Sequence, residues 1–125
     1  MIELAIVGMG GAIGAMLRYV LSLRIAGLMG TDFPWGTVTV NVLGSFLIGL
    51  LAVALEVKTS SPHYVRLGLM VGVLGGFTTF SAFSADTLHL LESQQWFKAM
   101  LYISASVLLC IVAAAAGMTA ARQIS

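Results

Sequence analysis

The chain has 125 residues, of which 59% are hydrophobic and only 9% charged, with six basic against five acidic side chains. Soluble globular domains carry about 25% charged residues, so this composition excludes a soluble domain and predicts a membrane protein. The formal net charge of +1 provides no basic field for nucleic acid. One cysteine, Cys110, lies inside an apolar stretch, which excludes a disulfide framework and a zinc site.

Charged residues divide the chain into four apolar segments. Three uncharged runs, 33–55, 67–85 and 99–121, are 19 to 23 residues long, and about 20 helical residues cross the hydrocarbon core of a bilayer. In the first segment Arg18 interrupts an apolar pattern that then resumes, so we interpret this segment as one long or tilted helix with a buried arginine. The expected membrane helices of this single transmembrane domain, residues 1–125, are 3–28, 35–57, 64–91 and 96–122.

The first segment has two rival interpretations. A cleavable signal peptide requires Lys or Arg ahead of the apolar run, and none precedes it. The run Gly8–Gly14 resembles a nucleotide-binding loop, but the G-x-G-x-x-G spacing fails at Ile13. Helix packing is the better interpretation, because small residues four apart let transmembrane helices approach closely. Glycine pairs with this spacing are Gly10/Gly14, Gly68/Gly72 and Gly72/Gly76.

Short connections join the four spans, so sequential helices should pack antiparallel. Residues typical of turns occupy 27–34, 59–62 and 92–95. With four spans, the basic residues divide between the two membrane sides as Lys58, Arg66 and Arg122 against Arg24 and Lys98. This near-equal division gives almost no positive-inside bias. The sequence therefore leaves open whether the chain inserts in one orientation or in both.

The third span contains the most unusual local sequence, the run Gly75–Thr79. Two glycines followed by two β-branched threonines propagate a helix poorly. Irregular backbone at membrane depth must be buried in protein or line a cavity, and free carbonyls at such a break are typical cation ligands. We therefore expect a mid-membrane break at Gly75-Gly76, with a plain kink covered by a neighbouring helix as the alternative.

Polar and aromatic side chains in three spans fall on single helical faces, at spacings of three, four and seven residues. The three stripes are Thr37, Asn41 and Ser45; Phe80, Phe83, Ser84 and Thr87; and Tyr102, Ser106 and Cys110. Ser and Thr often bond their own helix carbonyls, so a single stripe indicates little, but three together favour a lined path. No stripe contains a carboxylate or an amine. Amide N–H donors and the positive edges of aromatic rings favour an anion in such a path.

Three segments of the chain resemble the CrcB/Fluc family of small fluoride channels. They are Gly11-Ala12-x-Gly14-x-x-x-Arg18-Tyr19, Asn41-x-x-Gly44-Ser45-Phe46 and the run Gly75–Ser84. The resemblance covers essentially the full chain and implies an all-α protein of the bacterial inner membrane that forms an antiparallel, dual-topology homodimer. It further implies two fluoride pores and a structural sodium ion at the dimer centre. The family usually has threonine where this chain has Ala82, so a hydroxyl is missing beside Ser81.

The resemblance also implies roles for individual residues. Asn41, Phe80 and Phe83 should line the pores, and Tyr102 and Ser106 should continue the polar track. The other residues expected in the fluoride pathway are Arg18, Thr79, Ser81 and Ser84. The backbone carbonyls of Gly75 and Thr78 should hold the sodium ion.

Two other functional classes remain as alternatives. A dual-topology, proton-coupled exporter would share the size and charge balance, but such coupling needs a carboxylate inside the membrane. Most acidic residues fall at span ends, and Asp86 lies toward the end of the third span. A passive scaffold would explain the glycines but not Asn41 or the stripe of Phe80 and Phe83. The sequence thus predicts passive transport rather than an enzyme, by an assembly of at least two copies, since four spans are too few to enclose a path.

Overall fold

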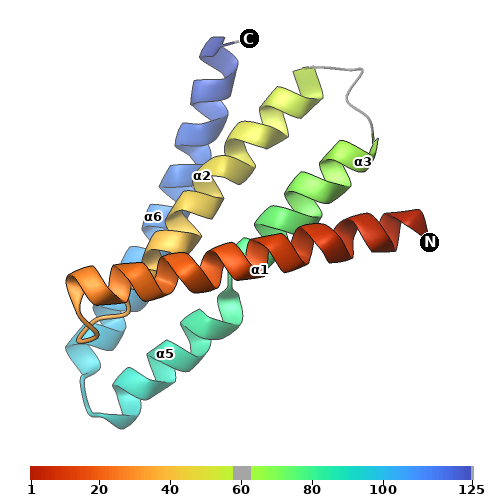
Figure 1. The fold of residues 1–125 in the computed structure, drawn as a ribbon. Helices are drawn as coiled ribbons and strands as arrows, with labels where there is room; N and C mark the ends of the chain where they lie inside the picture. Colours follow the sequence, from red (N-terminus) through yellow and green to blue (C-terminus); the bar gives the residue numbers. More distant parts are fainter. Residues whose placement is uncertain (58–62, 125) are drawn as a thin grey trace.

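The computed structural model describes residues 1–57 and 63–124, and nearly all of these are helical (Figure 1). The elements in chain order are α1 (Ile2–Met29), α2 (Trp35–Val57), α3 (His63–Arg66), the π-helix η1 (Leu67–Leu74), α4 (Gly75–Phe77), α5 (Phe80–Glu92) and α6 (Trp96–Ile124). The elements α3, η1 and α4 follow one another without a gap, so the third span consists of one rod up to Phe77 and a second, α5, beyond it. The turn expected at 59–62 lies outside the described residues.

Four helical stretches are long and apolar enough to cross a membrane. They are Ile2–Met29, Trp35–Glu56, His63–Glu92 and Trp96–Ile124. Each boundary falls within two residues of the range expected from the charged residues. An all-helical fold with four candidate membrane spans is therefore confirmed.

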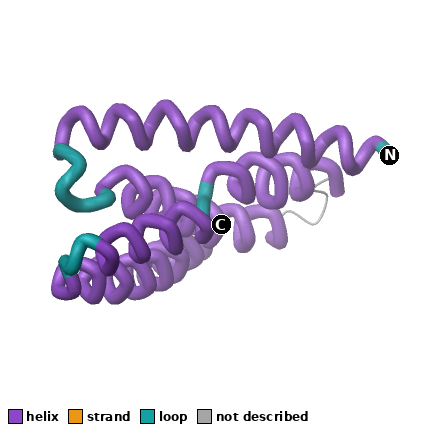
Figure 2. The backbone as a smooth tube through the Cα atoms, turned by 90° about the horizontal axis from the view of Figure 1, so that it is seen from below, coloured by secondary structure: helices purple, strands orange, loops and turns teal. Residues whose placement is uncertain are grey.

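Two close helix pairings build the bundle. Helices α2 and α6 run side by side, while α1 crosses the third span (Figures 1 and 2). Glycine permits both contacts: a Cβ added at Gly117 would lie 2.8 Å from the backbone nitrogen of Leu50, and one added at Gly10 would lie 2.6 Å from the Gly68 carbonyl oxygen. The four-residue glycine spacing in the first span therefore serves helix packing, as the sequence predicts.

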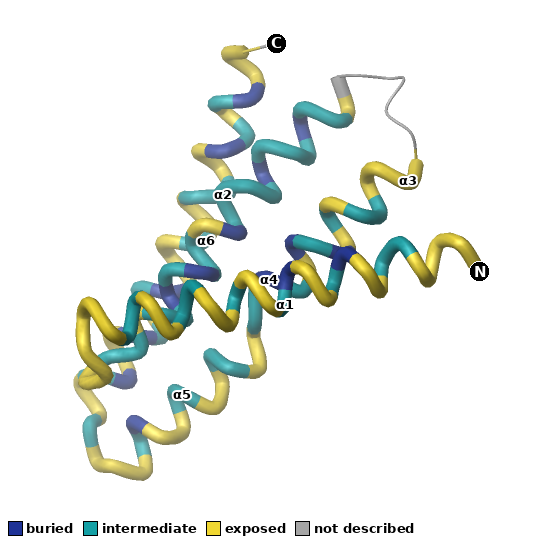
Figure 3. The backbone as a smooth tube through the Cα atoms, in the orientation of Figure 1, coloured by how far each residue is buried: buried dark blue, intermediate teal, exposed yellow. Residues whose placement is uncertain are grey.

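One cluster of buried side chains lies where α2, α5 and α6 meet. This cluster is formed by Val38, Leu90, Ala99 and Tyr102, with Phe83 packed against it. In contrast, α1 and α5 expose much of their length (Figure 3). Exposed apolar surface suits contact with lipid or with another transmembrane protein, because neither offers water.

The break in the third span lies at Thr78 and Thr79, so the expectation of a break at Gly75-Gly76 is wrong by three residues. Thr78 and Thr79 are extended, with φ/ψ of −86°/157° and −151°/119°, conformations that suit β-branched side chains. Both glycines remain helical, and Gly76 packs closely against α1: a Cβ at Gly76 would lie 2.5 Å from the Gly11 carbonyl oxygen. The break nonetheless falls at the midpoint of His63–Glu92, as a mid-membrane break requires.

The backbone on either side of the break is also unusual. Before it, η1 is a π-helix, and the Gly75 N–H bonds back to the carbonyls of Met70 and Gly72. After it, the Thr79 side chain caps α5 by accepting a hydrogen bond of 3.0 Å from the Ala82 N–H. Single π turns inside helices are frequent at functional sites, which directs attention to the space beside Thr78 and Thr79.

Candidate functional site

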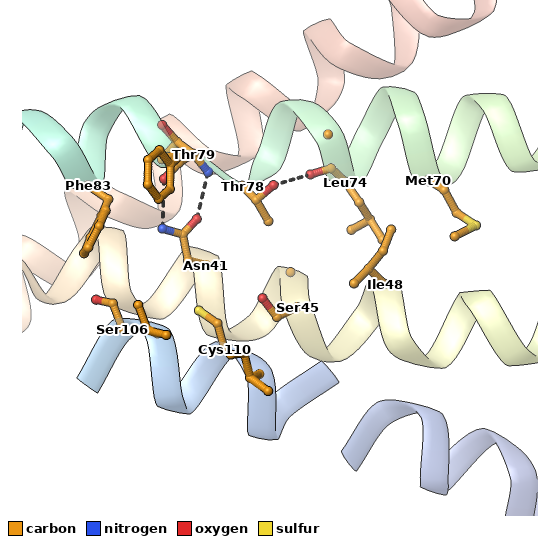
Figure 4. Close-up of a pocket in the computed structure, with 15 residues that line it drawn as sticks. Asn41, Ser45, Ile48, Met70, Leu74, Thr78, Thr79, Phe83, Ser106 and Cys110 are labelled. Atoms are coloured by element: carbon orange, nitrogen blue, oxygen red, sulfur yellow. Dashed lines mark hydrogen bonds between the residues drawn. The ribbon is translucent and has the colours of Figure 1, made fainter. Parts of the chain in front are cut away.

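A cavity of about 400 Å³ lies beside the break in the third span (Figure 4). Its polar lining comes from Asn41, Ser45, Thr78, Thr79, Ser106 and Cys110, and its apolar lining includes Ile48, Met70, Leu74, Phe80 and Phe83. None of these lining residues carries a formal charge. The cavity therefore brings together members of all three polar stripes, from α2, the third span and α6.

The Asn41 side chain holds the break in place rather than pointing freely into the cavity. Its Nδ2 donates to the Thr79 carbonyl at 2.9 Å, and its Oδ1 accepts from the Thr79 N–H at 2.7 Å (Figure 4). These bonds satisfy two backbone groups that the break removes from the helical pattern. An amide NH₂ has two N–H donors, so one remains for a ligand.

Both hydroxyls on the α5 stripe, those of Ser84 and Thr87, form hydrogen bonds within the third span. Ser84 Oγ donates to the Phe80 carbonyl at 3.0 Å, and Thr87 Oγ1 donates to the Phe83 carbonyl at 2.8 Å. Thr79 Oγ1 and Ser81 Oγ share a hydrogen bond of 3.2 Å. Ser84 and Thr87 thus have the local bonding that Ser and Thr commonly adopt in helices, and neither lines the cavity beside the break.

Ser106 on α6 differs from these residues. Within residues 1–57 and 63–124, its Oγ is the only buried side-chain nitrogen or oxygen without a hydrogen-bond partner, and the residue is 6% exposed. Leaving a buried hydroxyl unsatisfied costs about 1–3 kcal/mol. A ligand in the cavity that accepts a hydrogen bond from this O–H would therefore satisfy the buried donor.

Two phenylalanine rings, Phe80 and Phe83, line the cavity. The ring centroid of Phe83 lies 5.3 Å from that of Phe80 and 5.1 Å from that of Tyr102. Phe83 is half-buried, whereas Phe80 is 78% exposed on this single protomer. Phe80 therefore lines the cavity at its open side.

The carboxylate of Asp86 joins the polar track formed by Tyr102 and Ser106. The sequence did not predict this contribution. Asp86 Oδ2 accepts hydrogen bonds from Thr37 Oγ1 at 2.8 Å and from Tyr102 Oη at 3.1 Å. Thr37 and Asp86 also line a second cavity of about 260 Å³ near the turn between α1 and α2. The spacing in the sequence could have indicated this, because Asp86 follows Phe83 by three residues and so lies on the same helical face. The absence of a carboxylate from the polar stripes is therefore a weaker argument against an exporter than the sequence suggested.

The chain matches the family model described as CrcB-like protein, Camphor Resistance (CrcB), over residues 5–118. A fluoride-specific ion channel FluC from Geobacter sulfurreducens is 51% identical over 114 residues, which cover 91% of this chain and 92% of the relative. The chain belongs to the CrcB/FluC family. FluC proteins of Magnetococcus marinus and Rhizobium meliloti are 47% and 48% identical over 122 and 120 residues, covering 98% and 96% of this chain. The resemblance read from the sequence is confirmed, and the chain is a multi-pass membrane protein rather than an enzyme.

The structure does not bring every expected pathway residue of this CrcB/FluC protein into the cavity. Arg18 donates from Nε to the Gly76 carbonyl at 3.1 Å and is absent from the cavity lining. Ser81, Ser84 and Tyr102 also lie outside that lining, although the Tyr102 ring contacts the lining residue Phe83. Ala82, where the family usually has threonine, contributes its backbone N–H to the Thr79 cap.

The two residues expected to hold sodium both line the cavity. Gly75 lies on the last helical turn before the break, and Thr78 is the first extended residue of the break. Among the described residues, no group of three or more His, Cys, Asp or Glu side chains could hold a metal ion. A cation at this place would therefore take neutral oxygen ligands, such as backbone carbonyls or hydroxyls.

Proposed function

We propose that this CrcB/FluC protein is a passive fluoride channel through which fluoride leaves the cytoplasm across the bacterial inner membrane. Its relatives are named fluoride-specific ion channels, and the cavity offers chemistry that suits a small anion. The observation that carries the proposal is the unpartnered, buried hydroxyl of Ser106. A partly dehydrated fluoride accepts hydrogen bonds, so it would satisfy a donor that has no partner within the chain.

The same cavity contains further positive groups for an anion. The remaining Asn41 N–H and the ring edges of Phe80 and Phe83 carry partial positive charge. In an apolar environment these partial charges act more strongly than in water. Because no lining side chain has a formal charge, the anion is stabilised without being trapped, which is what conduction requires.

We place the working channel in an antiparallel, dual-topology homodimer with two pores. The near-equal division of basic residues between the two sides supports insertion in both orientations. The 78% exposure of Phe80, at the open side of the cavity, supports closure by a second copy. A two-fold axis would give each protomer the same contact surface and produce two equivalent paths.

The carbonyls of Gly75 and Thr78 are proposed to bind a structural sodium ion at the centre of that dimer. The neighbouring carbonyls of the break already have donors: Leu74 accepts from Thr78, Gly76 from Arg18 and Thr79 from Asn41. In the described part of the chain, the hydrogen bonds outside regular helices provide no donor for the Gly75 and Thr78 carbonyls. Hard cations prefer oxygen ligands of this kind, so these residues fit a sodium ion, whose positive charge would favour a nearby anion.

Fluoride efflux from liposomes tests the function. Purified protein should release fluoride, followed with an electrode, much faster than chloride, and collapsing the pH gradient with a potassium shunt open should not stop the flux. Ser106→Ala should lower the rate roughly 10- to 150-fold, because a hydrogen bond to a charged group contributes about 1.5–3 kcal/mol. Ser104→Ala, at an exposed position on the same helix, is the matched control.

The possible results separate the proposed functions. Equal rates for Ser106→Ala and wild type would show that the anion does not pass this hydroxyl. Flux that needs the pH gradient would instead support the proton-coupled exporter.

The dimer has its own test. Adding two or three lysines within 59–61 should force most copies into one orientation and lower activity, and co-expression with an oppositely charged variant should restore it. Full activity of a uniformly oriented population would contradict the antiparallel arrangement.

A further inference from the structure

Helix α1 packs directly against the backbone of the third span just before the break. A Cβ added at Gly14 would lie 2.9 Å from the Phe77 nitrogen and would also overlap the Val73 carbonyl group. Arg18 follows Gly14 by four residues, which places it on the same face of α1 one turn further on. Its Nε reaches across to the Gly76 carbonyl at 3.1 Å, a contact between residues 58 positions apart in sequence.

This contact replaces a helical hydrogen bond that the break abolishes. In an uninterrupted helix the Gly76 carbonyl would accept from the N–H of residue 80, but Thr78 and Thr79 are extended and interrupt that pattern. Helix α4, Gly75–Phe77, ends the continuous rod, so no following helical turn donates hydrogen bonds to its carbonyls. Arg18 from α1 and Asn41 from α2 therefore hold the two sides of the break.

Successive helical carbonyls differ in direction by about 100° around the axis. Fixing the Gly76 carbonyl toward α1 consequently fixes the direction of the preceding Gly75 carbonyl. Gly75 lines the cavity, whereas Arg18 is absent from that lining. The Arg18 contact thus acts on the cation site through one backbone group, without reaching the proposed fluoride path.

We propose that Arg18 is a positioning residue for the cation site, and that it does not bind the permeating anion. The guanidinium orients the Gly76 peptide, and this leaves the Gly75 carbonyl free to bind a hard cation together with Thr78. Lysine should not reproduce this contact, because its only side-chain nitrogen lies one bond further from the backbone than the Arg18 Nε that donates to Gly76. The inference rests on the cation site described under the proposed function.

The test compares Arg18→Gln and Arg18→Lys with Arg24→Gln, a control at an exposed position on the same helix. Fluoride efflux is measured while sodium is replaced by N-methylglucamine, and separately while fluoride is varied at saturating sodium. Both Arg18 variants should need at least tenfold more sodium for half-maximal flux. Their half-saturating fluoride concentration should stay within twofold of wild type, and Arg24→Gln should match wild type in both measurements.

A second readout does not depend on flux. Sodium should raise the melting temperature of the detergent-purified wild type, and this sodium-dependent increase should shrink or vanish in the Arg18 variants but persist in Arg24→Gln. If Arg18→Gln does not fold, Arg18→Lys, which keeps the positive charge, is compared with wild type and Arg24→Gln instead.

The outcomes distinguish this inference from the function on which it rests. Unchanged sodium dependence would overturn the positioning role, and a change in fluoride dependence alone would in addition place Arg18 on the anion path. Wild-type protein that conducts fluoride without regard to sodium would refute the cation site itself, and the positioning role with it. Wild-type protein that conducts no fluoride, yet is stabilised by sodium in an Arg18-dependent way, would refute only the channel function.

Discussion

Replacing Asn41 by aspartate changes one atom of the side chain and tests the contact that closes the helix break. In the variant an oxygen takes the place of Nδ2, which donates to the Thr79 carbonyl at 2.9 Å, so two acceptors would face each other. The loss of this bond leaves the Thr79 carbonyl without its partner, at a cost of about 1–3 kcal/mol. The bond from the Thr79 N–H to Oδ1 can persist, so the backbone at the break should become less firmly held without unfolding the third span.

The added negative charge has a second, larger effect on an anion in the cavity. At a separation of about 5 Å and an effective dielectric constant of about 20, two unit charges repel by roughly 3 kcal/mol. This corresponds to a rate about 150-fold lower. Loss of the Thr79 bond slows transport further if the break must keep its shape, so we expect fluoride efflux to fall at least 100-fold.

Two control variants separate the charge from the hydrogen bonds. Asn41→Leu keeps the branched side-chain shape and removes both bonds without adding charge, and it should lower efflux less than Asn41→Asp does. Thr39→Val, on the same helix, removes only a bond from Oγ1 to the Trp35 carbonyl and should leave efflux unchanged. Initial rates are read with a fluoride electrode on protein that elutes as a single species. A rate for Asn41→Asp within threefold of wild type would refute both the role of Asn41 at the break and its place on the path.

Three further substitutions test the cavity wall and the fold. Phe83→Ile keeps most of the volume but removes the ring edge, and efflux should fall several-fold because each such edge contributes about 1 kcal/mol; an unchanged rate would place the ion elsewhere. Gly14→Ala should lower the melting temperature and the yield of folded protein, since overpacking costs about 1–3 kcal/mol, whereas Gly8→Ala, with no neighbour within 4 Å of its added Cβ, should not. Gln94 has φ of 59° in the turn after α5, so Gln94→Gly should stabilise the protein by about 0.5–1 kcal/mol; a lower melting temperature would contradict this.

Features that depend on residues close in sequence could be predicted without the structure. The four spans follow from runs of apolar residues between charges, because the bilayer thickness sets the helix length. The close approach of α1 to the third span follows from Gly10 and Gly14, because small residues one turn apart leave room for a neighbouring backbone. A break near Gly75–Thr79 follows from poor helix propensity, and the membership of the CrcB/FluC family follows from the same local motifs.

The tertiary structure decided where the helix breaks and which hydrogen-bonding groups already have partners within the protein. Propensity placed the break at the glycines, but contact with Gly11 of α1 keeps Gly76 helical and moves the break to Thr78 and Thr79. Nothing in the spacing of the polar stripes shows that Asn41 binds the Thr79 backbone, or that Arg18 reaches a carbonyl 58 residues away. The roles assigned to the individual pathway and sodium residues therefore stay predictions, which measurements of fluoride flux and sodium dependence test.

The hydroxyl groups illustrate the same division. By sequence, Ser84 and Ser106 are equivalent small polar residues on helical stripes. In the fold, Ser84 bonds the Phe80 carbonyl of its own helix, whereas the hydroxyl of Ser106 is buried and has no partner among the described residues. Asp86 likewise joins the polar track only because α2 and α6 bring Thr37 and Tyr102 within hydrogen-bonding distance of it. The sequence determines which donors and acceptors enter the membrane, and helix packing decides which of them remain for an ion, because hydrogen bonds between helices depend on distances that sequence spacing does not contain.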